Sequence, residues 1–128
     1  MTESAARWMP VPDIDGGFAS IVFTFQGGPE RVLNLEMRGE RNLQLRFTGV
    51  IAVRYEDECP GFDPLPKPLP MLKTGVTFPL LRVDESRWLS QWLMYKGLTH
   101  FAMISSEDLI QLIAKPEVDA SWNVCGPA

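Results

Sequence analysis

The chain carries a single histidine, and acid–base or nucleophilic chemistry near neutral pH would have to be built around it. His100 follows Thr99, and a nucleophile would have to come from Ser105, Ser106 or Cys59. Neither serine sits in a Gly-x-Ser-x-Gly turn, and Cys59 precedes a proline with no local Cys–His signature. We therefore assign no catalytic residue and interpret His100 as structural. The question of enzymatic activity stays open, and the sequence favours a protein that is not an enzyme.

Carboxylates are the second group that could do chemistry, through a hard cation such as calcium or magnesium. The densest group is 56–58, Glu-Asp-Glu, but successive side chains of a strand point to opposite faces and cannot all converge. The run is typical of a charged strand exit. Asp84 and Glu85 suit a helix start, and Asp13 with Asp15 suits turns. The sequence predicts no metal site.

Two cysteines and two glycine pairs complete the survey of reactive and ligand-binding types. Cys59 and Cys125 match no zinc spacing, and two reduced thiols are favoured, although a bridge between them is neither supported nor excluded. Gly16-Gly17 and Gly27-Gly28 are not phosphate loops, because neither precedes a helix. We expect no cofactor.

Aromatic residues supply the most suggestive spacing in the chain. Trp88, Trp92 and Tyr95 fall at i, i+4 and i+7 of a predicted helix over 85–96. Aromatic residues at this spacing are usually a core-facing stripe, and we favour that interpretation over a ligand pocket. One indole at the rim of a groove would still serve as a binding contact.

The elements that would position these residues begin with a strand pattern. Alternation predicts strands over 18–26, 32–37 and 42–55, joined by short turns into an antiparallel meander. In the first of them Ile21, Phe23 and Phe25 share one face. In the longest strand the alternation keeps its parity across Gly49, which indicates a bend or a close backbone approach there.

The second half of the chain is less regular. A proline-rich loop over 57–72 denies the backbone several N–H donors and should be extended. A short edge strand is expected near 76–78, then the 85–96 helix with Asp84 as N-cap, and then strand character over 98–104. The apolar run 106–114 fits a second short helix or a strand. Residues 117–128 either lie across the domain or fray.

Charge and hydropathy exclude several classes of partner. Acidic side chains outnumber basic ones 16 to 12, giving a net charge of −4, so phosphate neutralisation is unfavourable and nucleic-acid binding is not expected. No apolar run is long enough to span a membrane, and residues 1–10 have no secretory apolar region. We expect a cytoplasmic protein.

Three segments carry a resemblance to known proteins: Leu45–Val53 with the following Glu58–Pro60, then His100–Ile104, then Asp108–Ala114. In strand composition the chain resembles small uncharacterised bacterial α+β proteins, some of which are immunity proteins to polymorphic toxins. The resemblance implies a compact acidic domain that binds a partner protein, and it carries no functional residue over.

These observations predict an α+β fold in one domain over 1–128, with an irregular arm over 1–17 and an antiparallel meander packed against the 85–96 helix. We predict a non-enzymatic interaction domain that binds a partner protein. A basic partner would suit it, because the acidic charge of the domain would steer such a partner toward it. The expected contact residues are Phe62, Leu65, Lys67, Leu69, Trp88 and Trp92, beside the acidic run. The alternative is a small-molecule-binding or enzymatic domain with a pocket walled by the Trp88/Trp92 helix. A homo-oligomer formed through an edge strand is a third hypothesis.

Overall fold

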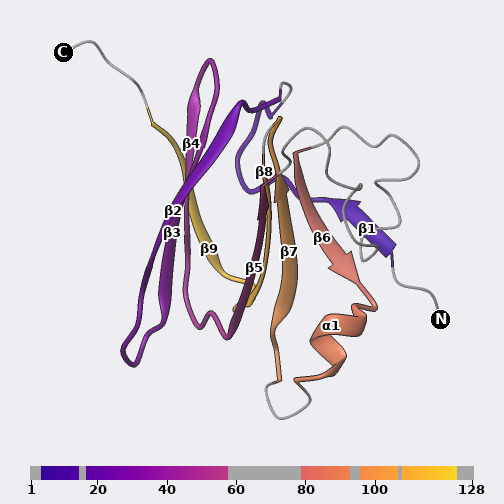
Figure 1. Cartoon of the computed structure of the whole chain (residues 1–128). Helices are drawn as coiled ribbons and strands as arrows, with labels where there is room; N and C mark the ends of the chain where they lie inside the picture. Colours follow the sequence, from indigo (N-terminus) through magenta and orange to yellow (C-terminus); the bar gives the residue numbers. More distant parts are fainter. Residues whose placement is uncertain (1–3, 15–16, 58–78, 93–95, 107, 124–128) are drawn as a thin grey trace.

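Nine strands and one short helix make up the described part of the chain. The computed structural model describes residues 4–14, 17–57, 79–92, 96–106 and 108–123 (Figure 1). The elements are β1 (Ser4–Arg7), β2 (Ser20–Gln26), β3 (Val32–Arg38), β4 (Asn42–Phe47), β5 (Ala52–Asp57), β6 (Leu80–Asp84), α1 (Arg87–Ser90), β7 (Thr99–Ile104), β8 (Asp108–Ala114) and β9 (Val118–Asn123).

The strands form two antiparallel sheets that pack face to face as a sandwich. One sheet has five strands in the order β1-β6-β7-β8-β5, and the other has four in the order β2-β3-β4-β9. Figure 1 shows the four-stranded sheet on the left and the five-stranded sheet on the right. Edge strands are therefore β2 and β9 in one sheet and β1 and β5 in the other, within the described residues.

The core lies between the sheets and is built from alternate residues of their strands. The rings of Phe47 on β4 and Phe101 on β7 meet at 5.2 Å between centroids, and Trp8 packs on Phe101 at 4.6 Å. The buried cluster contains, among others, Leu33, Leu35, Met37, Leu43 and Leu45 from one sheet and Leu80, Met103, Ile110 and Leu112 from the other. A single core of this kind is what joins the two sheets.

The predicted meander is confirmed over β2, β3 and β4, where Phe23 pairs with Leu35 and Leu35 with Leu45. The expected single strand over 42–55 is wrong in one respect, since it is two strands that belong to different sheets. The bend expected at Gly49 is where the chain passes between sheets, with φ of +63°. The connection from β8 to β9 runs beside it, and Lys115 N–H donates to the Thr48 carbonyl at 3.0 Å.

The predicted α+β class is wrong, because the described chain is almost entirely β. Asp84 does not cap a helix but ends β6, where it pairs with Ser4 of β1. Glu85 then adopts a left-handed conformation with φ of +56°, and the Ser86 side chain caps α1 by accepting Leu89 N–H at 3.0 Å. The helix ends at Ser90, so the main helix expected over 85–96 is a single turn.

Other expectations divide between strands and segments outside the described residues. The strand expected over 98–104 is β7, and the open choice over 106–114 is settled as strand β8. Residues 118–123 form β9, and within the expected arm Ser4–Arg7 form β1. The proline-rich loop beyond Asp57 and the edge strand near 76–78 lie outside the described residues.

Candidate functional site

The residues predicted to bind a partner are only partly described. Phe62, Leu65, Lys67 and Leu69 lie outside the described residues, as do the side chains of the 56–58 run. Trp88 and Trp92 are both half-buried. The Trp88 ring stands edge-on to His100 at 5.2 Å and faces the Arg54 guanidinium at 4.8 Å, so it packs on the five-stranded sheet and covers the histidine.

His100 is fully buried, and both of its ring nitrogens are in hydrogen bonds. Nδ1 lies 2.7 Å from Ser86 Oγ, and Nε2 lies 2.8 Å from Gln111 Oε1. Because the Gln111 amide oxygen can only accept, the network assigns the imidazole proton to Nε2, and Nδ1 then accepts the hydrogen bond from the Ser86 hydroxyl. The histidine on β7 thus links the N-cap of α1 to β8 on the outer face of the sheet and has no access to solvent.

The serines considered as nucleophiles have other partners. Ser105 Oγ accepts Asp108 N–H at 2.9 Å, and Ser106 Oγ donates to the Phe18 carbonyl at 3.3 Å. Cys59 lies outside the described residues. Neither described serine is placed to serve His100 in catalysis, and Ser86, which does contact it, is buried and occupied as a helix cap.

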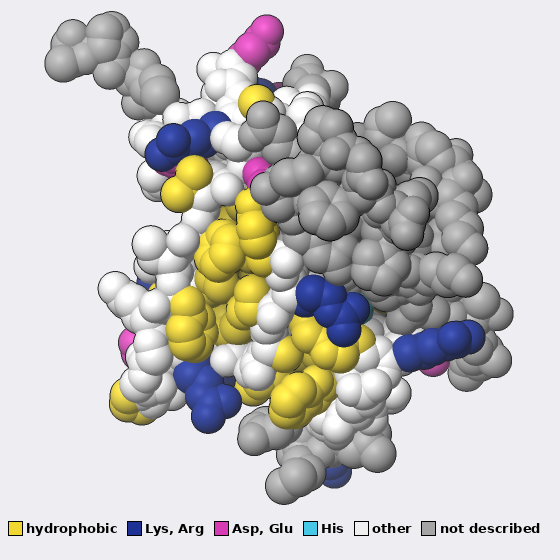
Figure 2. All heavy atoms as spheres, viewed as in Figure 1, with side chains coloured by type: hydrophobic (Ala, Val, Ile, Leu, Met, Phe, Trp, Pro, Cys, Tyr) yellow, Lys and Arg dark blue, Asp and Glu magenta, His cyan; other side chains and the backbone are white. Residues whose placement is uncertain are grey.

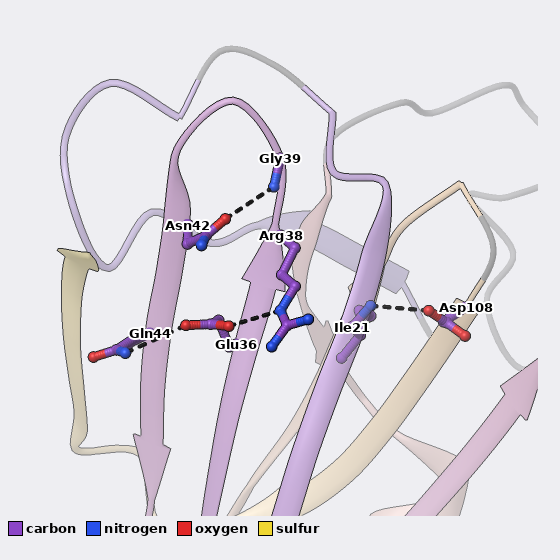
Figure 3. A network of polar contacts seen from close by, with 7 residues as sticks. All are labelled: Ile21, Glu36, Arg38, Gly39, Asn42, Gln44 and Asp108. Carbon is purple, nitrogen blue, oxygen red and sulfur yellow. Dashed lines mark hydrogen bonds and ion pairs between the residues drawn. The ribbon is translucent and has the colours of Figure 1, made fainter. Parts of the chain in front are cut away.

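Asp108 forms a polar bridge between the two sheets. Its side chain is 5% exposed, and Oδ2 accepts Ile21 N–H of β2 at 2.9 Å (Figure 3). The other oxygen, Oδ1, accepts a hydrogen bond from the Tyr55 hydroxyl on β5. One buried carboxylate therefore joins β2, the edge of one sheet, to β5 and β8 of the other.

Beyond this bridge the two edge strands separate, and an apolar groove opens between them. We call it the edge groove, a cavity of about 500 Å³ lined by Phe23, Phe25, Arg31, Leu33, Val50, Ile51, Ala52 and Val53. Large apolar side chains are exposed along its two strands, with Phe25 at 50%, Val53 at 39% and Tyr55 at 43%. Figure 2 shows that hydrophobic side chains gather near the middle of one face of the molecule, with basic side chains around them.

Both ends of the edge groove are fixed by contacts between the sheets. At one end the Phe23 and Tyr55 rings lie 5.3 Å apart, beside the Asp108 bridge. At the other, Val50 N–H donates to the Arg31 carbonyl at 3.1 Å. The groove is therefore held in shape without a ligand, as binding sites commonly are.

Sequence reasoning missed this site because it placed Ile21, Phe23 and Phe25 on one face of a strand and did not distinguish how deeply each is buried. The structure buries Ile21, leaves Phe23 half-buried and exposes Phe25, since the facing sheet ends at β5. The signal in the sequence is an aromatic residue at the turn end of a strand. Whether such a residue is buried or exposed depends on the strand order, and the alternation of polar and apolar residues does not reveal that order.

A larger hollow, about 820 Å³, crosses the outer face of the four-stranded sheet and has polar residues at its centre. There Glu36 accepts hydrogen bonds from Arg38 Nε at 2.8 Å and Gln44 Nε2 at 3.4 Å (Figure 3). The bond from Arg38 is the main cause that lowers the pKa of Glu36 below its ordinary value, and Gln44 adds to it. Such mixed polarity is ordinary for the solvated face of an antiparallel sheet, so we place the candidate site in the edge groove.

No helix among the described residues is long and apolar enough to cross a membrane. Within the same residues, no group of three or more His, Cys, Asp or Glu side chains is arranged to hold a metal ion. Comparison of the chain with protein-family models, curated proteins and solved structures finds no match.

Proposed function

We propose that this chain is a non-enzymatic protein-binding domain, and that it takes up an extended segment of its partner along the edge groove. The observation that carries the proposal is the exposure of Phe25, Val53 and Tyr55 on two facing edge strands. Exposed apolar side chains that gather in one place mark interaction surfaces more often than isolated ones do.

The strand edges favour an extended segment over a compact ligand. Each of β2 and β5 has a neighbouring strand on one side only, within the described residues, so part of its backbone is available for further pairing. A partner segment added to such an edge gains main-chain hydrogen bonds, and its alternate side chains enter the apolar groove.

The state of His100 supports a role without catalysis. Its imidazole is buried, engaged at both nitrogens and covered by Trp88. A general base must reach the proton that it removes, and this imidazole is fully buried with both nitrogens bonded to side chains of the protein.

The wider setting of the proposal comes from the sequence. The net charge of −4 would steer the domain toward a basic partner in the cytoplasm, and the resemblance to immunity proteins adds a toxin as a candidate. The kind of partner is thus proposed from charge and composition, whereas the binding site is proposed from the geometry of the edge groove.

The test is a selection of short random linear peptides on the immobilised chain, followed by binding measurements with two matched variants. Phe25→Ser alters the edge groove, whereas Val22→Ser alters an apolar residue on the opposite face of β2 with a similar exposure of 43%. We expect selected peptides to lose at least about tenfold in affinity for Phe25→Ser and to bind Val22→Ser normally. Equal binding to both variants, or no selected peptide, would overturn the proposal. Binding of small metabolites that depends on Trp88 would favour the pocket hypothesis instead.

A further inference from the structure

We infer that the edge groove selects a partner segment that carries a carboxylate next to its apolar stretch, and that Arg31 binds this carboxylate. The inference rests on the proposed function of the edge groove and adds the chemistry of the partner. It follows from the charge of Arg31, from its backbone conformation and from the residues around it.

Arg31 is the one charged residue among those that line the edge groove, and its side chain is exposed. Arg31 takes no part in the ion pairs that join Glu36 to Arg38 and Arg46 to Asp119. A guanidinium presents a planar set of donors that matches the two oxygens of a carboxylate. An apolar groove that ends at such a group is complementary to an apolar segment with one negative charge.

The backbone of Arg31 is the second observation. Its φ of +47° lies in the left-handed region, where a side chain costs about 1 kcal/mol and glycine does not. The conformation is held from both sides, since Gly49 N–H donates to the Glu30 carbonyl at 2.9 Å and Val50 N–H to the Arg31 carbonyl. Strained non-glycine residues of this kind concentrate at functional positions. For the turn alone a glycine would serve better, so the arginine side chain needs another reason.

The surroundings decide between classes of anion. A polyanion such as nucleic acid is bound by clusters of cations, whereas Arg31 stands alone beside apolar residues in an acidic chain. A single carboxylate is the anion that this site fits. It is supplied either by an Asp or Glu side chain of the partner or by its C-terminus, and both offer the same two oxygens.

The experiment uses the peptides selected on the whole chain. Each is made with a free or an amidated C-terminus and with every acidic residue changed in turn to its amide. Affinities are measured for wild type, Arg31→Gln, Arg31→Lys and Arg46→Gln. Arg46→Gln removes an exposed arginine of the outer sheet face and serves as the control.

We expect each peptide to carry one carboxylate, in a side chain or at the C-terminus, whose removal weakens binding to wild type by about tenfold. Removing the same carboxylate should not change the affinity for Arg31→Gln. Arg31→Lys should keep part of the affinity and Arg46→Gln all of it. Peptides that depend on Phe25 but bind Arg31→Gln as well as wild type would overturn this inference and leave the proposed function standing. If no peptide depends on Phe25, both are wrong.

Discussion

Ser86 has two hydrogen-bond partners at once, and these let a small polar residue be buried in the interior. Its oxygen accepts a hydrogen bond from Leu89 N–H at the start of α1, and its hydroxyl group donates one to His100. His100 in turn donates to Gln111, whose Nε2 is buried without a hydrogen-bond partner among the described residues. Such a chain is stable only while each member keeps its neighbour, because an unpaired polar group in the interior is costly.

We predict that Ser86→Ala lowers the free energy of unfolding by about 2 kcal/mol, through the lost cap and the histidine nitrogen left unpaired. Ser90→Ala is the matched control, since this exposed serine donates only to the Arg87 carbonyl of the same turn. Urea denaturation measures both. Equal, small effects in the two variants would show that the Ser86–His100 contact contributes little.

Glu36 should give the chain a small pH dependence of stability. Because the folded pKa of this carboxyl lies below its ordinary value, ionisation favours the folded state. The contribution is present above about pH 4.5, the range where the unfolded group is ionised, and is lost as the pH falls through the folded pKa.

We therefore expect wild type to exceed Glu36→Gln by under about 1 kcal/mol at neutral pH, with the difference disappearing in acid. Unfolding curves over a pH series give the measurement. Arg38→Gln should remove most of this dependence, since Arg38 is its main cause. A difference that grows toward acid would contradict the assignment.

At the scale of elements, the passage from β4 to β5 depends on Gly49. A Cβ at this position would stand 2.8 Å from Lys115 Cγ, and the φ of +63° is unfavourable for any other residue. The glycine therefore lets the two connections between sheets run side by side.

Gly49→Ala should lower the free energy of unfolding by about 1–2 kcal/mol from backbone strain, with a further cost from displacing the lysine. In a Lys115→Ala background only the backbone part should remain. Gly27→Ala is the control, because its Cβ would meet no atom within 4 Å and its φ is not positive. Thermal or urea unfolding compares the three, and a Gly49→Ala effect no larger than that of Gly27→Ala would refute this account.

The sequence gives no sign that the helix predicted over 85–96 is wrong, because the residues at its start fit the pattern of a helix N-terminus. What overrides them is pairing with distant strands: Leu80–Asp84 lies between β1 and β7, and this carries Asp84 into the sheet. Local propensity predicts an element only when no long-range partner competes for the same residues. In the hairpins of β2, β3 and β4 each strand pairs with a neighbour in sequence. The alternation of polar and apolar residues was therefore enough to predict these strands.

At the scale of the whole molecule, Asp108 connects the sheets at one end of the groove. Removing its carboxylate would leave Ile21 N–H without this acceptor and would release the Tyr55 hydroxyl from the bridge. We predict that Asp108→Ala costs about 3 kcal/mol and Asp108→Asn less, because the amide keeps one acceptor oxygen.

Tyr55→Phe serves as the comparison, because it removes one donor from the bridge and leaves the bond to β2 intact, at about 1 kcal/mol. Urea denaturation ranks the three variants. If Asp108→Ala proved no worse than Tyr55→Phe, the bond from Asp108 to β2 would contribute little to joining the sheets.

Most of the strands could be predicted, but neither their distribution between two sheets nor the groove could. Strand periodicity shows which residues share a face, as with Leu43, Leu45 and Phe47 on β4. It contains no information that Asn42 pairs with Asn123, so the edges, and with them the exposure of Phe25, are properties of the assembled sandwich. The fully buried strand β8 shows the same limit, because a strand buried on both faces has no alternation of polar and apolar residues.

The strand order also bears on how the protein is made. During synthesis β2, β3 and β4 emerge in succession after β1 and can pair as hairpins, but the second neighbour of β4 is β9, whose residues 118–123 leave the ribosome much later. Likewise β1 waits for β6, and β5 for β8. Several strand edges of the nascent chain are therefore bare until their partners have been made, and the four-stranded sheet is complete only once β9 has emerged. Bare edges of this kind can pair with other chains, so we expect the partly made protein to aggregate more readily than the assembled sandwich.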